Sequence, residues 1–383
     1  MKSRLNSDEL RRRAQQALAN FVTRKIEAPP WANRKVVIYG AGGFGKDLAS
    51  ALIKSKATIL GFVDQKGTGQ VVYNELRAYN LQSDVIGQWL KEKPVIVIGV
   101  FNFINSIREI GDTLIAAGFS TVITPMELYL SLSEELGWRY WLGTSENYTN
   151  AFDSLEKVLG LWADEESQRQ YLETLLFRLE GDLNALSVIS NPDSQYADST
   201  VPRWKEPLRM VDGGACHGDA VRCLASQGYK FDSIFSFEPD ETNFEHLRAE
   251  LTTVSLGARI SIWPCGLWSS SCKMMFWEGG GASSRLADVG TSQIPVVALD
   301  DVLIDQQINL IKLDIEGAEP AALQGAKRII SKDRPGLAIC LYHYPNHLWT
   351  IPLWAENLGL GYRLYYRAHQ QNSFDTIMYA VPQ

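Results

Sequence analysis

The sequence predicts an α/β protein composed of two units of the same kind. A glycine-rich turn follows an apolar strand twice, at Gly40–Gly45 and at Asp212–Asp219. An acid ends the next strand each time, at Asp64 and at Glu238, with nearly the same spacing from the turn. Apolar strands also alternate with helical patterns from residue 208 onward. This order of strand, turn, helix and acid predicts two Rossmann-like domains.

The size and charge of the chain limit its organisation and its partners. Its 383 residues are too many for one ordinary hydrophobic core. The net charge of −7 supplies no basic field, so nucleic acid is not an expected partner. We predict an N-terminal helical arm at 1–30, a Rossmann-like nucleotide-binding domain at 31–125, a helical connector and loop at 126–200, and a second α/β domain at 201–383.

The chain lacks the apolar segments of membrane and secreted proteins. No run of about eighteen apolar residues is present, and the N-terminus is polar where a signal peptide needs an apolar stretch. The five cysteines include no Cys-x-x-Cys pair, so reduced thiols are expected. We predict a soluble, cytoplasmic protein without membrane insertion, and a homo-oligomer is compatible with this prediction.

The first unit carries a dinucleotide-type fingerprint. A buried strand at 35–39 leads into a turn with Gly40, Gly42 and Gly45, and the following strand ends at Asp64. Glycines let the backbone approach a pyrophosphate, and the acid can accept hydrogen bonds from a ribose. Further strands are expected at 95–99 and 121–123, with a helix at 105–117 between them. We therefore predict a second nucleotide site here, for NAD or another nucleotide.

Seven strands are expected in the second unit. The last is preceded only by a short polar loop, which predicts a doubly wound sheet whose final strand runs antiparallel. The expected strands are 208–211, 233–237, 260–264, 310–313, 337–342, 362–367 and 376–380.

The turn of the second unit begins with an acid on the strand end itself, unlike a dinucleotide turn. Asp212 can face the cationic amino group of a methionine moiety, and no pyrophosphate needs room, which favours S-adenosylmethionine over NAD. Glu238 can accept two hydrogen bonds from ribose hydroxyls, and His217 is expected to shape the pocket. The candidate cofactor-binding residues are Asp212, Gly213, Gly214, Ala215, His217, Gly218, Glu238, Pro239 and Asp314.

Acids and histidines gather at the edge of the second sheet where its parallel strands end. Asp314, Glu316 and Glu319 open a helix after one strand, which is more acid than a helix cap needs. His343 and His369 end two further strands. The candidate catalytic residues are His343 as the base and Asp314 and Glu316 as orienting acids; the alternative is a divalent-metal site formed by Asp314, His343, His369 and Asp375.

These motifs resemble the FkbM family of S-adenosylmethionine-dependent methyltransferases. The matching segments include 211–219, 237–240, 299–303, 311–319 and 337–343, and the resemblance covers about 195–383. It implies a class I methyltransferase sheet and methyl transfer, most often to a hydroxyl. A carbohydrate or another polyhydroxylated small molecule is the expected acceptor, and Trp349, Tyr342 and Tyr344 offer faces on which a sugar ring could stack.

Two other functions remain open from the sequence. One is an NAD-dependent oxidoreductase centred on Gly40, Gly42, Gly45 and Asp64, although no Tyr-x-x-x-Lys motif is apparent in the first unit. The other is a non-catalytic role of the first unit in binding a sugar nucleotide or in oligomerisation. In the second unit, the glycine-rich loop at 279–285 is suited to closing over the methionine end of the cofactor or over the substrate.

Overall fold

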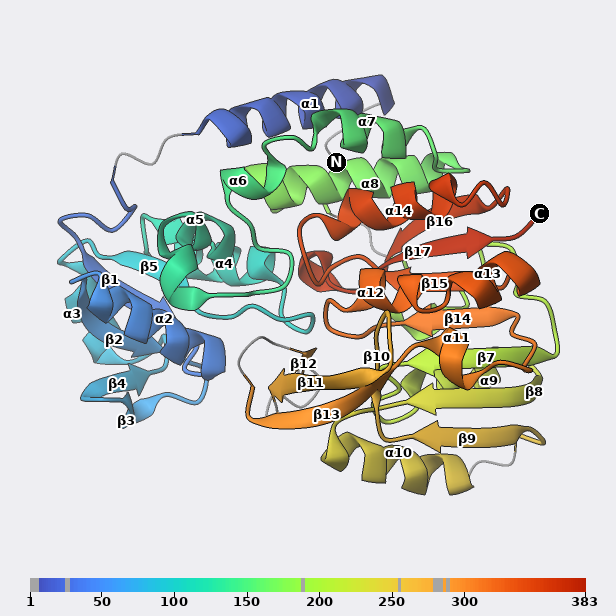
Figure 1. Cartoon of the computed structure of the whole chain (residues 1–383). Coiled ribbons are helices and arrows are strands. Elements are labelled where there is room, and N and C mark those ends of the chain that lie inside the picture. Colours follow the sequence, from blue (N-terminus) through green and yellow to red (C-terminus); the bar gives the residue numbers. More distant parts are fainter. Residues whose placement is uncertain (1–6, 25–27, 187–189, 254–255, 278–284, 287–289) are drawn as a thin grey trace. The chain divides into compact units, whose positions relative to one another are not determined.

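A computed structural model describes residues 7–24, 28–186, 190–253, 256–277, 285–286 and 290–383 (Figure 1). The chain forms two compact units. Unit 1 comprises Met1–Phe152, Arg169–Val188 and Gln370–Phe374, and unit 2 comprises Asp153–Gln168, Ile189–His369 and Asp375–Gln383. Both have the predicted α/β composition. No helix within the described ranges is long and apolar enough to cross a membrane.

Unit 1 is organised around a six-stranded sheet of order β3-β4-β2-β1-β5-β6, in which β3 alone pairs antiparallel. Its strands are β1 Lys35–Tyr39, β2 Thr58–Val63, β3 Thr68–Tyr73, β4 Leu76–Tyr79, β5 Val95–Ile98 and β6 Val122–Ile123. Its helices are α1 Ser7–Thr23, α2 Gly43–Lys54, α3 Asp84–Leu90, α4 Ile107–Ala116, α5 Pro125–Leu136 and α6 Ser145–Tyr148. The β3–β4 hairpin was not predicted, because its residues are half exposed and lack an apolar run.

The glycines of the first turn serve the packing of α2 against the sheet. A Cβ at Gly45 would lie 2.0 Å from the carbonyl oxygen of Gly40, and Gly40 itself has φ +98°. Gly42 and Gly43, in contrast, face open space. The close approach of helix and strand therefore requires glycine at 40 and 45, whatever the turn binds.

Unit 2 contains a seven-stranded sheet of order β16-β17-β15-β14-β7-β8-β9, and β17 runs antiparallel to both of its neighbours. Its strands are β7 Leu208–Gly213, β8 Phe231–Phe237, β9 Arg259–Trp263, β14 Leu310–Leu313, β15 Gly336–Cys340, β16 Arg363–Ala368 and β17 Thr376–Val381. Its helices are α7 Phe152–Leu159, α9 Asp219–Ser226, α10 Glu241–Thr253, α11 Leu299–Val302, α12 Glu319–Gln324, α13 Lys327–Asp333 and α14 His347–Asn357, with a short 3₁₀ turn at Pro192–Ser194.

A second, four-stranded sheet of unit 2 has the order β10-β13-β11-β12 and was not predicted. Its strands are β10 Gly266–Leu267, β11 Cys272–Trp277, β12 Arg285–Leu286 and β13 Ser292–Val297. Phe276, Ile294 and Val296 form its small core. Two of these strands have only two residues, which is too short for a recognisable pattern in the sequence.

The stretch predicted as a helical connector, 126–200, is not a separate layer. Helix α8, Glu165–Glu180, begins in unit 2 and continues into unit 1. Gln371–Ser373 forms a 3₁₀ turn in unit 1, although the flanking strands β16 and β17 belong to unit 2. The first turn of α8 is held in unit 2 by Arg367, which is 1% exposed and lies 2.7 Å from Asp164. Residues 126–152 and 169–188 of the stretch belong to unit 1, and residues 153–168 and 189–200 belong to unit 2.

We expect Gly45→Ala to lower the free energy of unfolding of unit 1 by about 1–3 kcal/mol, because the new methyl group would overlap the Gly40 carbonyl. Gly42→Ala is the matched control, and its effect should stay within about 0.5 kcal/mol because nothing lies within 4 Å of its Cβ position. Urea denaturation of both variants measures the difference. Equal stability of the two would mean that the turn relaxes without cost.

Candidate active site

Unit 2 brings the predicted site residues to one edge of its sheet. Strands β7, β8, β14 and β15 are parallel, so their carboxyl ends meet there. The turn after β7, Glu238 after β8, Asp314 after β14 and His343 after β15 all lie at this edge. Open α/β sheets bind their ligands at this position.

The glycine turn between β7 and α9 is closely packed against the end of β14. Gly214 has φ +70°, and a Cβ there would lie 1.8 Å from the Asp314 carbonyl oxygen. The N–H groups of Gly214 and Ala215 both donate to the Phe237 oxygen, at 3.0 and 3.1 Å. Gly218, with φ +80°, then begins α9 in the left-handed conformation. The backbone of this turn therefore excludes side chains at two of its three glycines.

Glu238 is tied to the same turn. Its two carboxylate oxygens accept from the Cys216 N–H at 2.8 Å and from the Asp240 N–H at 2.9 Å. Burial raises the pKa of Glu238, and these two hydrogen bonds oppose the rise. Asp64 makes the corresponding contacts in unit 1, accepting from Ala41 N–H and Lys66 N–H at 2.9 Å each. Glu238 and Asp64, the two acids predicted to bind a ribose, thus stabilise the glycine turns of their own units. Each carboxylate oxygen can still accept a second hydrogen bond.

Asp212, predicted to face the methionine end of the cofactor, is paired inside the sheet. Its side chain is fully buried, and Lys312 Nζ lies 3.0 Å from its Oδ1. The sequence prediction placed Asp212 correctly at the strand end but missed its partner on β14. The available signal was a lysine inside the otherwise apolar strand Leu310–Leu313, since a buried cation needs a counter-charge.

His343 is the centre of a buried group of acids. Its Nδ1 lies 2.8 Å from Glu319 Oε1, and its Nε2 lies 3.3 Å from Asp314 Oδ1 and 3.7 Å from Glu316 Oε2. His343 and Glu319 are completely buried, whereas Asp314 and Glu316 are partly exposed. The sequence prediction grouped Glu319 with the other acids but did not identify it as the partner of His343.

The charges in this group favour an ion pair between Glu319 and His343. Burial alone would raise the pKa of Glu319, but His343 outweighs it and lowers that pKa to about 2. Burial alone would lower the pKa of His343, but Glu319 and Glu316 outweigh it and raise that pKa to about 10. The raised pKa of His343 favours the imidazolium, which has no lone pair to accept a proton, and so argues against its predicted role as the base.

Glu316 is the acid with the opposite shift. Burial raises its pKa to about 8, with Asp314 and Glu319 adding to the rise and His343 opposing it. Its φ of +55° is rare for a residue with a side chain, and Gly317 follows with φ +103°. Its Oε2 accepts no hydrogen bond from any described residue. Glu316 is thus a carboxyl group with a pKa near neutrality in a strained turn, both frequent properties of functional residues.

Two tyrosines hold Asp314. The hydroxyl of Tyr342 donates to Oδ1 at 3.0 Å, and that of Tyr196 donates to Oδ2 at 3.2 Å. Asp375 is close to this group, because Asp314 and a hydrogen bond from Tyr342 act on its pKa, which burial raises to about 7. Asp375 is not among the closely spaced residues Asp314, Glu319 and His343, so its predicted place in a metal set stays a prediction.

His369 does not join the cluster, contrary to the predicted metal set. Its Nδ1 lies 3.1 Å from the Asn191 oxygen and its Nε2 lies 2.7 Å from the Tyr379 hydroxyl. Within the described ranges, the residues spaced closely enough to hold a metal are Asp314, Glu319 and His343. Binding of a metal by these residues would require His343 to lose its proton, because a histidine ligand is the neutral imidazole.

The other aromatic and histidine side chains near the site differ in their burial. Trp349 and Tyr342 belong to the core, and so does His347, whose Nδ1 lies 3.5 Å from Glu319 Oε2. Tyr344 is 38% exposed and covers Gly317, so it alone of the three aromatics can meet a ligand face. The loop predicted at 279–285 lies outside the described residues except for Arg285, which stacks on Trp277 at 5.0 Å.

A comparison with known families indicates the class of protein to which this site belongs. Residues 212–368 match the family model of the methyltransferase FkbM domain. The resemblance found in the sequence is confirmed for this part of the chain, and the match indicates a methyltransferase. The FkbM domain begins at Asp212 and includes the turn, Glu238 and the His343 cluster, but not the glycine turn of unit 1.

The crystal structure of methyltransferase FkbM from Methylobacillus flagellatus KT has a similar fold. It aligns with a TM-score of 0.80 and 22% identity, over 98% of this chain and 100% of that chain. A tRNA (uracil-54, C5)-methyltransferase from Pyrococcus abyssi, solved with S-adenosyl-L-homocysteine, aligns with a TM-score of only 0.25 and 11% identity, over 63% and 41% of the two chains. No curated protein matches the sequence.

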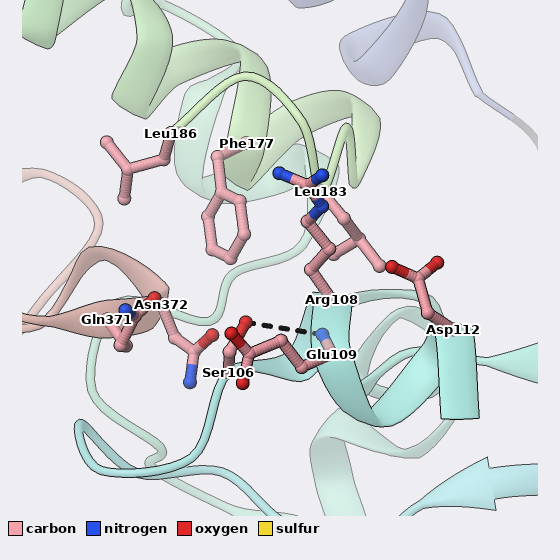
Figure 2. Close-up of a pocket in the computed structure, with 9 residues that line it drawn as sticks. All are labelled: Ser106, Arg108, Glu109, Asp112, Phe177, Leu183, Leu186, Gln371 and Asn372. Carbon is pink, nitrogen blue, oxygen red and sulfur yellow. Dashed lines mark hydrogen bonds between the residues drawn. The ribbon is translucent and has the colours of Figure 1, made fainter. Parts of the chain in front are cut away.

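Unit 1 also contains a hollow of about 270 Å³ outside the FkbM domain (Figure 2). Ser106, Arg108 and Asp112 line it, together with Phe177 and Asn372. Figure 2 shows the Ser106 side chain accepting from the Glu109 N–H, an ordinary helix cap. The charged residues of the lining are exposed, so this hollow has the character of a surface depression and we assign it no ligand.

We expect alkaline pH to destabilise unit 2 through the Glu319–His343 pair. The folded-state pKa of His343 is about 10 against an ordinary value of 6.5, so its contribution is complete below pH 6.5 and is lost as pH rises toward 10. The free energy of unfolding in urea should fall by more than about 1.4 kcal/mol between pH 6.5 and 9.5, the equivalent of one pKa unit.

The double variant Glu319→Gln/His343→Asn is the control for this experiment, because it removes both charges and leaves no ion pair to titrate. Its stability should decrease less than that of the wild type over the same pH range. An equal decrease in the two proteins would mean that other groups cause the effect.

Proposed function

We propose that the protein transfers a methyl group from S-adenosylmethionine to a hydroxyl oxygen of a carbohydrate or another polyhydroxylated small molecule. The observation that carries the proposal is the glycine turn with Glu238 beside the carboxylate–histidine cluster, all within the matched FkbM domain. S-adenosylmethionine supplies an activated methyl group, so the protein must align an acceptor and remove its proton.

The cofactor side of the proposed site is the turn Asp212–Gly218 with Glu238 and Pro239. Glu238 would accept from ribose hydroxyls with the acceptor sites that Cys216 and Asp240 leave unused. Ala215 and His217 would form the wall of the pocket, and the partly exposed carboxylate of Asp314 would attract the cationic methionine end. Asp212 contributes through the fold of the turn because it is buried.

The acceptor side is supported by Tyr344 and Glu316. Tyr344 offers an exposed ring at the turn that contains Glu316, and a sugar ring can stack on such a face. The oxygen of the acceptor would bond to the methyl carbon as the carbon–sulfur bond breaks, leaving S-adenosylhomocysteine. The hydroxyl proton would pass to the carboxylate of Glu316, whose pKa of about 8 suits a base near neutral pH.

His343 acts on this step through charge rather than by accepting the proton. As an imidazolium it lowers the pKa of Glu316, and Glu319 holds it in place from the opposite side of the ring. No step is assigned to a metal, because Glu319 occupies one ring nitrogen of His343 and a metal would have to displace the proton shared in this pair. A chelator should therefore leave activity unchanged, and its loss on chelation would favour the metal alternative.

For unit 1 we propose a nucleotide-binding role without catalysis, in which Gly42 and Gly43 leave open space beside the N-terminus of α2. The NAD-dependent oxidoreductase alternative has no further support, since the family match covers the second glycine turn and not the first.

We expect Glu238→Gln to weaken binding of S-adenosylhomocysteine by about ten- to a hundred-fold, the usual cost of losing hydrogen bonds to a charged acceptor. Asp64→Asn is a matched control, because Asp64 braces the glycine turn of unit 1 through the same type of contact. Isothermal titration calorimetry should give this control the affinity of the wild type. Weakening by Asp64→Asn and not by Glu238→Gln would place the cofactor in unit 1.

We expect Glu316→Gln to lower kcat by at least about a hundred-fold without changing cofactor affinity, as loss of a general base does. The assay is release of S-adenosylhomocysteine in the presence of a panel of sugars and other polyols. In the wild type, kcat/KM should rise with pH and level off above about 8, because the deprotonated carboxylate is the active form.

His343→Asn provides the contrast for Glu316→Gln. Removing the imidazolium should move the rising limb of the pH profile to higher pH, because His343 lowers the pKa of Glu316. An unmoved limb with a lost kcat would instead identify His343 as the base.

A further inference from the structure

Lys312 is a buried cation at the centre of the second sheet. It lies on β14, where all four residues are buried, and its side chain is 4% exposed. In the parallel register of β14 and β7 it is paired with Asp212, and Leu313 is paired with Gly213. The ammonium group therefore lies directly beside the start of the glycine turn.

Three oxygens surround this ammonium group. Nζ lies 3.0 Å from Asp212 Oδ1, and it donates to the carbonyl oxygens of Gly213 at 3.1 Å and Gly214 at 2.7 Å. A lysine ammonium has three N–H donors, so all of them have partners. Two of the three partners belong to the backbone of the turn, which is more than neutralisation of Asp212 requires.

The two carbonyl contacts determine the orientation of consecutive peptide groups. The Gly214 and Ala215 N–H groups donate to the Phe237 oxygen while the Gly213 and Gly214 carbonyls point to Lys312. The turn has no side chains of its own at these glycines, and Gly214 adopts φ +70°, where glycine is otherwise free to move. Lys312, on the neighbouring strand, restricts the backbone conformation of the turn through these two hydrogen bonds.

Lys312 also contacts the acidic side of the site. The Tyr196 ring lies 5.5 Å from Nζ, and the hydroxyl of Tyr196 donates to Asp314 Oδ2 at 3.2 Å. One buried cation is thus linked to the glycine turn and, through one aromatic ring, to Asp314.

We propose that Lys312 is the positioning residue of the cofactor site, and that it sets cofactor affinity by holding the Gly213 and Gly214 carbonyls. This inference rests on the proposed binding of S-adenosylmethionine in unit 2. Lys312 does not touch the cofactor itself, because it lies inside the sheet behind the turn.

The test distinguishes the effect of the hydrogen bonds from Lys312 to the Gly213 and Gly214 carbonyls from the effect of its ion pair with Asp212. Lys312→Met alone leaves Asp212 buried without its cation, and this variant is expected to be unstable. The double variant Asp212→Asn/Lys312→Met removes both charges and restores neutrality. Asp212→Asn is the control for the carbonyl contacts, since it keeps the ammonium group and both of its contacts with the turn; it leaves Lys312 without its counter-charge and is therefore also expected to be less stable than the wild type. All full-length proteins are compared in thermal unfolding, in calorimetric binding of S-adenosylhomocysteine, and in amide hydrogen exchange of the peptide 212–219.

We expect the double variant to be at least as stable as Asp212→Asn in thermal unfolding, because it contains no unpaired buried charge. It should nevertheless bind S-adenosylhomocysteine at least ten-fold more weakly, with faster exchange in 212–219. S-adenosylhomocysteine is the probe because it lacks the sulfonium charge, so repulsion by an unpaired Lys312 does not distort the comparison. Equal affinity of these two variants would overturn the inference. Equal weakening of both would also overturn it, because the ion pair and not the carbonyl contacts would then matter.

The proposed function fails in a different way. No binding of S-adenosylhomocysteine to the wild type would contradict the cofactor assignment and, with it, the role of Lys312. Binding to the wild type with no difference between the two variants would contradict the role of Lys312 alone.

Discussion

The buried ion pair between Lys312 and Asp212 is the interaction on which the second unit depends. It joins the two central strands, β7 and β14, at the point where both approach the edge that carries the site. A fully buried carboxylate is costly unless it is paired, and the pair here is completed by two backbone carbonyls. The glycine turn, the start of α9 and the position of Asp314 all follow from this arrangement.

The same physical rule governs the cluster around His343. Glu319, Asp314 and Glu316 could not all be ionised in a largely buried space without a cation, because like charges at short range raise one another's pKa values. The imidazolium pairs with Glu319, whereas burial, with Asp314 and Glu319 adding to its effect, raises the pKa of Glu316. The proposed base therefore owes its raised pKa to its buried position beside a stable ion pair.

Much of the sheet of unit 2 was predictable because its strands are apolar runs bounded by turn residues. The expected strand at 310–313 coincides with β14, and that at 376–380 differs from β17 by one residue. The β3–β4 hairpin and the small sheet of β10–β13 were missed, because their half-exposed or two-residue strands carry no periodic signal. The stretch predicted as a connector is divided between the two units, because helices such as α8 pack against parts of the chain that are distant in sequence.

The sequence by itself determined the type and order of the elements, the two glycine turns and the edge at which the acids and histidines gather. Those features depend on local patterns and on the rule that parallel strands end together. Only the tertiary structure decided that Asp212 is paired with Lys312, that Glu319 is paired with His343, and that His369 contacts Tyr379. The reason is that protonation and pairing depend on distances of a few ångströms between strands, which spacing along the chain does not specify.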